Sequence, residues 1–382
     1  MKENSTEIES KQKNPYSYNG DVLISSSLPS QKDDDLEPQL SDSEVEKTKN
    51  PHRKKVYLET YGCQMNFADS EIVLSILKNN NYQMCKKAIE SDLILINTCS
   101  IREKAELNIR KKLNGYQKLK RGKKVKIGVL GCMAERLKKK FLEEEKIVDL
   151  VVGPDSYRDI PSLLKKVHNN EKAINVKFSK FETYEAIDPE RINSNNISAF
   201  VSITRGCDNM CTFCVVPFTR GRERSRDPKS ILNEIDLLDK KGFKEITLLG
   251  QNVDSYLWYG GGLKKDYSKA TELQKKTSLR FNNLLEIIAQ EKPNMRIRFS
   301  TSNPQDMSNE VIEIIAKYKN ICKHIHLPIQ SGSNKILKKM NRLHSKEEYL
   351  ILIKKIKARI PNCSISHDII VGFPSEEDQD HL

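Results

Sequence analysis

The sequence predicts an α/β protein built from two successive series of β-strands and helices. Short β-rich runs alternate with helical segments from Val56 onward, and such alternation is typical of parallel sheets. A polar stretch near residues 171–196 separates the two series. We therefore expect an N-terminal parallel-sheet βα domain over residues 51–170, a linker over 171–196 and a partial (β/α) barrel over 197–382.

The first 50 residues differ in composition from the rest of the chain. They are rich in Ser, Asn, Asp, Glu and Lys, and their few apolar residues follow no regular period, so we predict a disordered tail. Their formal charge is −5, which leaves +18 on the remaining 332 residues of a chain with net charge +13. This surplus favours a polyanionic partner such as nucleic acid, although a solvated, lysine-rich surface would give the same charge.

The composition excludes a membrane-embedded protein. Mean hydropathy is −0.61, and the sequence has no apolar run of about 18 residues, as a spanning helix requires. The N-terminus lacks the basic and then apolar order of a signal peptide. We expect a cytoplasmic protein whose nine cysteines are thiolate ligands or nucleophiles, because disulfides persist mainly in oxidising compartments.

The first series contains four predicted strands, each followed by a helix. The strands are VYLETYG, LILINT, VKIGVLG and VDLVVG, and the helices lie near residues 69–80, 102–120, 134–145 and 161–170. A cysteine stands at the end of each of the first three strands: Cys63, Cys99 and Cys132.

These three cysteines occupy equivalent positions in successive βα units. The carboxyl ends of parallel strands meet at one edge of a sheet, so the sulfurs can converge on one metal cluster if the strands are adjacent. The dipoles of the helices that follow would favour thiolates. The alternative is that they are small buried core residues, as free cysteines often are.

The second series contains five predicted strands separated by helical segments. The strands are AFVSITRGC, KEITLLGQN, MRIRFSTSN, HIHLPIQSGS and CSISHDIIVGF. Five such units predict a TIM-like barrel or part of one. A long loop over residues 255–279 follows the second strand, and the chain ends where the helix after the fifth strand should begin. We therefore expect a barrel that is incomplete at its C-terminus.

A compact cysteine motif follows the first strand of the second series. TRGCDNMCTFC places Cys207, Cys211 and Cys214 at C-x3-C-x2-C spacing. Three thiolates can hold three irons of a 4Fe-4S cluster, and the fourth iron then stays open to a substrate or cofactor. The alternative is a structural zinc site, which normally has four ligands at paired spacings. Three other cysteines share neither pattern and are expected to be structural: Cys85, Cys322 and Cys363.

These motifs carry a family resemblance. The C-x3-C-x2-C motif, with the aromatic Phe213 before its last cysteine, resembles the radical S-adenosylmethionine (SAM) superfamily. Together with ETYGCQMN, NTCSIREKAE, GVLGCMAER, LLGQNVDSY and HLPIQSGS, it resembles the methylthiotransferases of that superfamily over about residues 53–382. YGCQMN and GQNVDSY look like the branch that acts on N6-dimethylallyl (isopentenyl) adenosine beside the tRNA anticodon.

The resemblance implies a tRNA-modifying transferase with two 4Fe-4S clusters and SAM. The C-x3-C-x2-C cysteines would hold the cluster that binds and cleaves SAM, and Cys63, Cys99 and Cys132 would hold a second cluster that supplies or carries sulfur. The reaction would replace C2–H of the adenine by S–CH3, with a reducing electron donor such as flavodoxin or ferredoxin. Two alternatives remain: methylthiolation of threonylcarbamoyl-adenosine in tRNA or of a ribosomal-protein aspartate, and an iron-sulfur RNA-binding protein that has lost catalysis.

Further candidate residues lie at strand ends and after the cysteine motif. The resemblance suggests SAM contacts at Phe213 and at the ends of the second and fourth barrel strands: Gln251, Asn252, Gln330, Ser331 and Gly332. Four arginines at alternate positions could meet RNA phosphates on one face, or form a solvated basic segment: Arg220, Arg222, Arg224 and Arg226.

Other positions bear on the resemblance without defining a site. His324 and His326 share one face of a strand, where core packing competes with ligation. The sequence departs from the family's usual residues at Asn303 and His367. It also ends before the last barrel strand and the small C-terminal β-barrel domain with which the family binds RNA, so we expect that domain to be absent.

Overall fold

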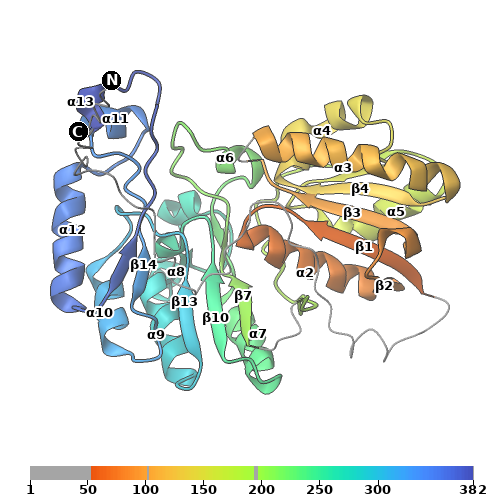
Figure 1. The fold of residues 1–382 in the computed structure, drawn as a ribbon. Helices are drawn as coiled ribbons and strands as arrows, with labels where there is room; N and C mark the ends of the chain where they lie inside the picture. The colour runs from red at the N-terminus through yellow and green to blue at the C-terminus, as the bar shows by residue number, and fades with distance from the viewer. Residues whose placement is uncertain (1–52, 101–102, 193–196, 382) are drawn as a thin grey trace, which may run out of the picture. The chain divides into compact units, whose positions relative to one another are not determined.

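The computed structural model describes residues 53–100, 103–192 and 197–381, and Figure 1 shows their fold. The predicted N-terminal tail lies outside these ranges, and so does the predicted start of the second helix at residue 102. Both predicted series of strands and helices are present, which confirms the α/β class.

Six parallel strands form the N-terminal sheet, in the order β2-β1-β3-β4-β5-β6. They are β1 (Lys54–Thr60), β2 (Tyr82–Met84), β3 (Leu93–Thr98), β4 (Lys126–Gly131), β5 (Leu150–Val152) and β6 (Ala173–Asn175). The helices are α2 (Gln64–Lys78), α3 (Glu103–Gly122), α4 (Cys132–Glu144) and α5 (Ile160–His168), with 3-10 turns at Ala88–Glu90 and Tyr157–Asp159. Separate hydrophobic clusters lie on the two faces of the sheet. Every residue of β3 is buried, which explains why its first four residues, LILI, are all apolar rather than alternating.

Two strands of this sheet were not predicted. β2 forms one edge beside β1, and β6 forms the other edge within the segment predicted to be a linker. Each is only three residues long, which is too short for an alternating pattern to distinguish it from a loop.

Helix α2 is buried along almost its whole length. All residues from Met65 to Leu77 are buried, polar ones included. The helix packs on β1 and also contacts β7 (Ser198–Ser202), where the rings of Phe67 and Phe200 meet edge to face with centroids 5.8 Å apart. A helix buried on all sides needs protein around it, and α2 is one of the elements through which the first series contacts the second.

The second series forms a partial barrel of parallel strands. The first group has the order β13-β10-β7, and the second is the pair β14-β15. A parallel bridge between Ile297 and Ile321 joins the two groups. The remaining strands are β10 (Glu245–Leu249), β13 (Arg296–Phe299), β14 (His324–His326) and β15 (Ser364–Ser366). The five predicted strands therefore lie side by side in chain order, as in a (β/α) barrel.

Helices and short elements connect these strands. The main helices are α7 (Pro228–Lys240), α9 (Phe281–Glu291), α10 (Asn309–Lys317), α11 (Asn334–Lys339) and α12 (Lys346–Arg359). The short elements are β8 (Thr204–Arg205), α6 (Val216–Thr219), β9 (Arg224–Ser225), a 3-10 turn at Val253–Ser255 and α13 (Asp378–His381). The predicted long loop instead contains β11 (Leu257–Trp258), a 3-10 helix (Lys264–Lys269), α8 (Glu272–Lys276) and β12 (Leu279–Arg280), and its two strands pair antiparallel. No helix within the described ranges has the length and apolar character needed to cross a membrane.

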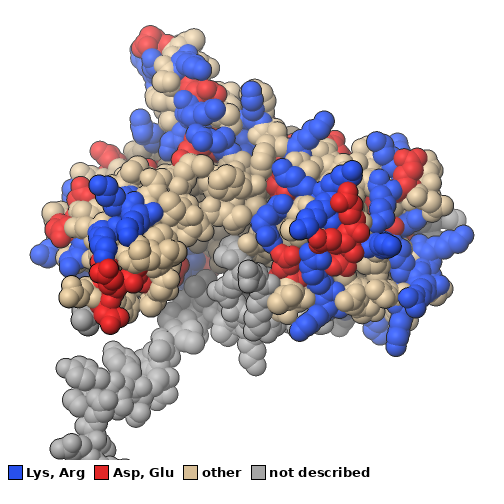
Figure 2. Space-filling model, turned by 90° about the horizontal axis from the view of Figure 1, so that it is seen from above, with Lys and Arg blue, Asp and Glu red and all other residues tan. Residues whose placement is uncertain are grey.

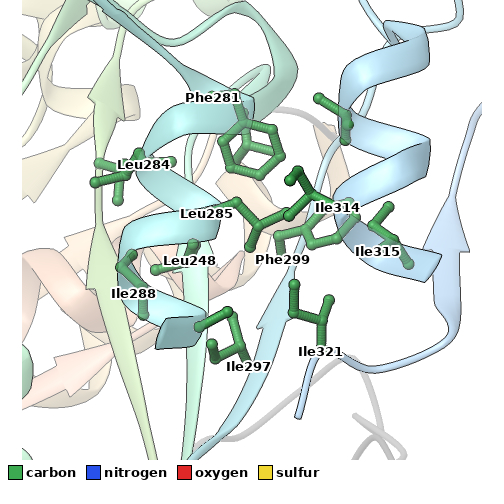
Figure 3. Close-up of a cluster of buried hydrophobic side chains, with 14 of the residues drawn as sticks. Leu248, Phe281, Leu284, Leu285, Ile288, Ile297, Phe299, Ile314, Ile315 and Ile321 are labelled. Carbon is green, nitrogen blue, oxygen red and sulfur yellow. The ribbon is translucent and has the colours of Figure 1, made fainter. Parts of the chain in front are cut away.

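The barrel core lies between its strands and helices α9 and α10. Figure 3 shows side chains from these elements pointing toward one another, among them Leu248, Leu285 and Ile297. These three side chains are fully buried, and burial of an aliphatic side chain of this size contributes about 1.5–3 kcal/mol.

The Ile297→Ala variant tests this core. We expect it to lower the free energy of unfolding by about 2–5 kcal/mol, because it removes buried methyl groups and leaves a cavity. The control is Ile351→Ala on α12, whose side chain is 65% exposed and should change stability by about 0.5 kcal/mol or less. Denaturant titration measures both, and equal losses would contradict the assignment of Ile297 to the core.

Candidate metal centres

Cys63, Cys99 and Cys132 follow three neighbouring strands. β1, β3 and β4 are adjacent in the sheet. The predicted convergence of the three sulfurs required adjacent strands, so this requirement is met. Cys63 is the N-cap of α2, Cys99 directly follows β3, and Cys132 is the first residue of α4. All three therefore lie at the carboxyl edge of the sheet, where ligand sites normally form.

Glycines allow the cysteine segments to approach one another closely. Gly62 has φ +109°, and a Cβ there would lie 2.4 Å from Cβ and 3.1 Å from Sγ of Cys99. Gly131 has φ +88°, and a Cβ there would lie 2.4 Å from Oδ1 of Asn97. A side chain at either position would strain the backbone and collide with neighbouring atoms. Glycine at position 62 therefore lets the segment of Cys63 lie against Cys99.

Burial and nearby charges act in opposite directions on the thiols of this group. Burial raises the pKa of the Cys132 thiol, whereas the Arg220 guanidinium lowers it. Metal binding displaces thiol protons. Within the described residues, no three His, Cys, Asp or Glu side chains are arranged to hold one metal ion. The three thiols at this sheet edge are of the donor type that iron-sulfur clusters take.

The second cysteine group lies on the loop between β8 and α6. Gly206, with φ +77°, lets the chain turn out of β8 toward Cys207. The N–H of Cys207 donates to the Gly221 carbonyl at 3.2 Å, and the N–H of Cys214 donates to the Cys211 carbonyl at 2.9 Å. Burial raises the pKa of Cys207 to about 12, while Cys211 and Cys214 are partly exposed. The loop is therefore held by a backbone hydrogen bond at Cys207, whereas Cys211 and Cys214 are partly accessible to solvent.

The segment after α11 supports this loop from the other side. The N–H of Thr212 donates to the Met340 carbonyl at 3.1 Å, and the side-chain amide of Asn341 donates to the Met210 carbonyl at 3.0 Å. These contacts hold the cysteine loop against a turn that is far away in the sequence.

Arg342 reaches one of the cysteines directly. Its Nη1 lies 3.6 Å from Sγ of Cys211, and its Nη2 donates to Oδ1 of Asn303 at 3.1 Å. Asn303, one of the departures from the family pattern, is thus a buried acceptor that orients this arginine. The sequence analysis missed Arg342 because 131 residues separate it from Cys211 and no local spacing connects them.

The predicted SAM contacts at the end of β10 have protein partners. Oε1 of Gln251 accepts a hydrogen bond from the N–H of Gly206 at 2.6 Å, so this side chain supports the cysteine loop. Asn252 is buried, and its Nδ2 donates to Asp306 at 2.6 Å while its Oδ1 makes no hydrogen bond within the described residues. The side-chain carbonyl of Asn252 is therefore a buried acceptor without a partner among the described residues.

The candidates after β14 and in the cysteine motif differ in exposure. Ser331 is buried, Gly332 is exposed, Phe213 is 40% exposed and Gln330 is partly exposed with φ +73°. Their role as SAM contacts stays a prediction.

Three of the four arginines predicted to bind RNA are buried and paired with carboxylates. Arg220 pairs with Asp69, Arg224 with Asp155 and Arg226 with Glu234, and the arginines are only 2%, 1% and 6% exposed. The prediction of a phosphate-binding face is wrong for these three, because their guanidiniums are buried inside the protein and do not reach its surface. Arg222 is the exception: its side chain is 42% exposed and lies 2.8 Å from Asp208.

The two histidines of β14 lie on one face, as the alternation predicted. His324 and His326 share a hydrogen-bond partner, Oγ of Ser366 on β15, at 3.1 and 3.0 Å. This hydrogen bonding favours the packing interpretation over ligation.

The Asp69 carboxylate joins α2 to the second series. Its Oδ1 accepts a hydrogen bond from Nη1 of Arg205 at 2.8 Å, and its Oδ2 lies 2.9 Å from Nη1 of Arg220. All three side chains are almost completely buried. The sequence analysis missed Asp69 and Arg205, because charged residues are usually exposed and nothing local marks these two as buried.

Comparison with known proteins bears on both cysteine groups. The model described as "Uncharacterized protein family UPF0004" matches residues 55–153, and the model of the radical SAM superfamily matches residues 201–382. The chain is 63% identical over 346 residues to the tRNA-2-methylthio-N(6)-dimethylallyladenosine synthase of Christiangramia forsetii, covering 90% of this chain and 72% of that protein. It is 66% identical over 334 residues to the protein of that name from Flavobacterium psychrophilum, covering 87% and 69%.

The chain belongs to the tRNA-2-methylthio-N(6)-dimethylallyladenosine synthase family. This confirms the resemblance to radical SAM methylthiotransferases. The radical SAM match covers the C-x3-C-x2-C group, and the other match covers Cys63, Cys99 and Cys132.

Solved structures share the fold at low sequence identity. The radical SAM methyltransferase TsrM from Kitasatospora setae has a TM-score of 0.59 at 12% identity, covering 86% of this chain and 69% of that chain. The cobalamin-dependent radical SAM enzyme OxsB has a TM-score of 0.60 at 15% identity, covering 86% and 51%. These likenesses support the two-part α/β architecture.

The Asp69→Asn variant tests the buried network of this family member. We expect it to cost about 3–5 kcal/mol of unfolding free energy, because it leaves two buried guanidiniums without a carboxylate. The matched control is Asp188→Asn, which removes an ion pair with Lys241 in which both side chains are about half exposed and which should cost about 0–1 kcal/mol. If thermal and denaturant melts give the same small loss for both variants, Asp69 does not carry the contact between the two series.

Proposed function

We propose that this chain methylthiolates C2 of N6-dimethylallyladenosine in tRNA. The observation that carries the proposal is that a chain 63% identical to a synthase of that name has two separate three-cysteine groups, one at the carboxyl edge of the N-terminal parallel sheet and one on the loop between β8 and α6. The relatives compared above carry the dimethylallyladenosine name, which favours this substrate over threonylcarbamoyl-adenosine or a ribosomal-protein aspartate.

The two cysteine groups would have different roles. Cys207, Cys211 and Cys214 would hold a 4Fe-4S cluster with one iron open to SAM, and the group of Cys63, Cys99 and Cys132 would hold a second 4Fe-4S cluster. When bound, the clusters and SAM supply a hydrogen-abstracting radical, the sulfur and the methyl group. The aromatic C2–H is neither acidic nor easily displaced, so this chemistry belongs to the cofactors, and the protein supplies binding and orientation.

Several side chains would orient the SAM-binding cluster. Gln251 fixes the backbone just before Cys207, and Arg342 places a positive charge beside Cys211. A cation near a thiolate favours the deprotonated form that ligates iron. The unpaired carbonyl of Asn252 lies at the end of β10, where it is available to a polar group of SAM.

Binding of tRNA would rely on charges spread over the surface. On the face shown in Figure 2, Lys and Arg side chains are interspersed with Asp and Glu side chains. Arg222 is the one member of the predicted arginine set that stays a candidate phosphate contact, since it is half-exposed. We further propose a cytoplasmic setting, with reduction by a donor such as flavodoxin or ferredoxin.

Removing the C-x3-C-x2-C cysteines should lower the iron content of the protein by one cluster. The variant with Cys207, Cys211 and Cys214 changed to Ala should hold about four irons per chain after anaerobic reconstitution, against about eight in the parent, because one cluster site is lost. It should also lose reductive cleavage of SAM. The control is Cys322→Ala, a cysteine outside both groups. An iron content equal to that of the parent would contradict the assignment.

Removing the other cysteine group should separate radical generation from sulfur transfer. The variant with Cys63, Cys99 and Cys132 changed to Ala should still cleave SAM to 5′-deoxyadenosine, because the SAM-binding cysteines lie on a different strand series. It should form no methylthiolated nucleoside when tRNA is analysed by mass spectrometry. Undiminished methylthio product would return these three cysteines to a structural role, and a different methylthiolated nucleoside in the parent would overturn the proposed substrate.

A further inference from the structure

We propose that Arg220 is a positioning residue for the second cysteine group, which balances the negative charge of that cluster from the side of the radical SAM series. The inference rests on the proposed function, because it assumes a cluster at Cys63, Cys99 and Cys132. The sequence pattern predicted that Arg220 contacts RNA phosphates and gave no indication of a role beside a cluster.

The chain brings Arg220 to this cluster site through α6. Arg220 is the C-cap of α6, which packs against α4, the helix that begins at Cys132. A short segment that follows the C-x3-C-x2-C cysteines therefore contacts the helix that begins with a cysteine of the other group.

Asn66 gives a second, independent connection. Its Oδ1 accepts a hydrogen bond from Nη2 of Arg220 at 2.7 Å, and Sγ of Cys63 lies 3.9 Å from the same oxygen. The Asn66 side chain is fixed in turn, because its Nδ2 donates to the Tyr61 carbonyl at 2.8 Å. One amide oxygen thus joins the arginine to a second cysteine of the group.

The buried charges around Arg220 do not balance without the cysteines. Arg205 and Arg220 share the single carboxylate of Asp69, and the neighbouring Asp155 is taken by Arg224. Nη1 of Arg220 lies 2.9 Å from Oδ2 of Asp69 but without the geometry of a hydrogen bond. An uncompensated buried charge is costly, and thiolates beside the guanidinium would supply the missing negative charge.

Arg205 has different neighbours. Its Nη2 donates to the Pro154 carbonyl at 3.1 Å, and its guanidinium carbon lies 4.7 Å from the centroid of the Tyr184 ring. The two arginines share a carboxylate but differ in their relation to the cysteines, which makes Arg205 a matched control.

A guanidinium beside the cluster should affect its reduction potential. One-electron reduction by an external reductant adds one negative charge to the cluster, and a nearby positive charge stabilises that reduced form. Charge and hydrogen bonds around an iron-sulfur cluster are established determinants of its potential. Loss of the Arg220 charge should therefore move the potential to more negative values.

The test uses the Cys207/Cys211/Cys214→Ala protein, in which the second cluster is the one that remains. Arg220→Gln and Arg205→Gln are compared by dithionite titration followed by electron paramagnetic resonance. Either substitution leaves one guanidinium with one carboxylate, so both proteins should fold, and Arg220→Met is a second variant that keeps the apolar stem. We expect a negative shift for Arg220→Gln that clearly exceeds that of Arg205→Gln, and a potential near that of the parent for Arg220→Lys.

The outcomes separate this inference from the proposed function. Equal potentials in Arg220→Gln, Arg205→Gln and the parent overturn the role of Arg220 while leaving the second cluster in place. A parent that binds iron and sulfide at no second site overturns the proposed function, and the inference with it. A shift shared equally by Arg220→Gln and Arg220→Lys also overturns the inference, because it would show that geometry rather than charge matters.

Discussion

The buried carboxylate of Asp69 constrains how the two strand series meet. It lies on α2, a helix that is enclosed by protein on all sides, and it is contacted by arginines from β8 and from the end of α6. A buried charge tolerates little displacement from its partners, because separation leaves it unsolvated. The position of α2 is therefore fixed relative to both the loop that carries Cys207, Cys211 and Cys214 and the sheet that carries the other group.

The parallel strands explain why cysteines distant in sequence can act together. A parallel sheet brings all its carboxyl ends to one edge, so Cys63, Cys99 and Cys132 lie at the same edge although each lies in a separate βα unit. This geometry follows from local patterns alone, since LILINT and VKIGVLG are buried strands with recognisable ends. The sequence accordingly predicted both strand series and the relation of the cysteines to them.

The sequence could not predict which charges are buried. Arginines at alternate positions after the cysteine motif have the pattern of an exposed basic strand, yet Arg220 and Arg224 find carboxylates in the first series. The hydrogen bond of Arg224 to Asp155 spans 69 residues, and that of Arg220 to Asn66 spans 154. Such partners appear only when two layers pack, and β2 and β6 escaped prediction for the related reason that three residues carry too little pattern.

The segment from Cys214 to Arg220 connects the loop of the C-x3-C-x2-C cysteines to the N-terminal sheet. α6 begins directly after this loop, and it packs against α4, the helix that begins at Cys132. Arg220, the C-cap of α6, contacts the Asp69 carboxylate and Oδ1 of Asn66, both of which belong to α2. Under the proposed function, this connection would keep the cluster that cleaves SAM in register with the cluster that supplies sulfur.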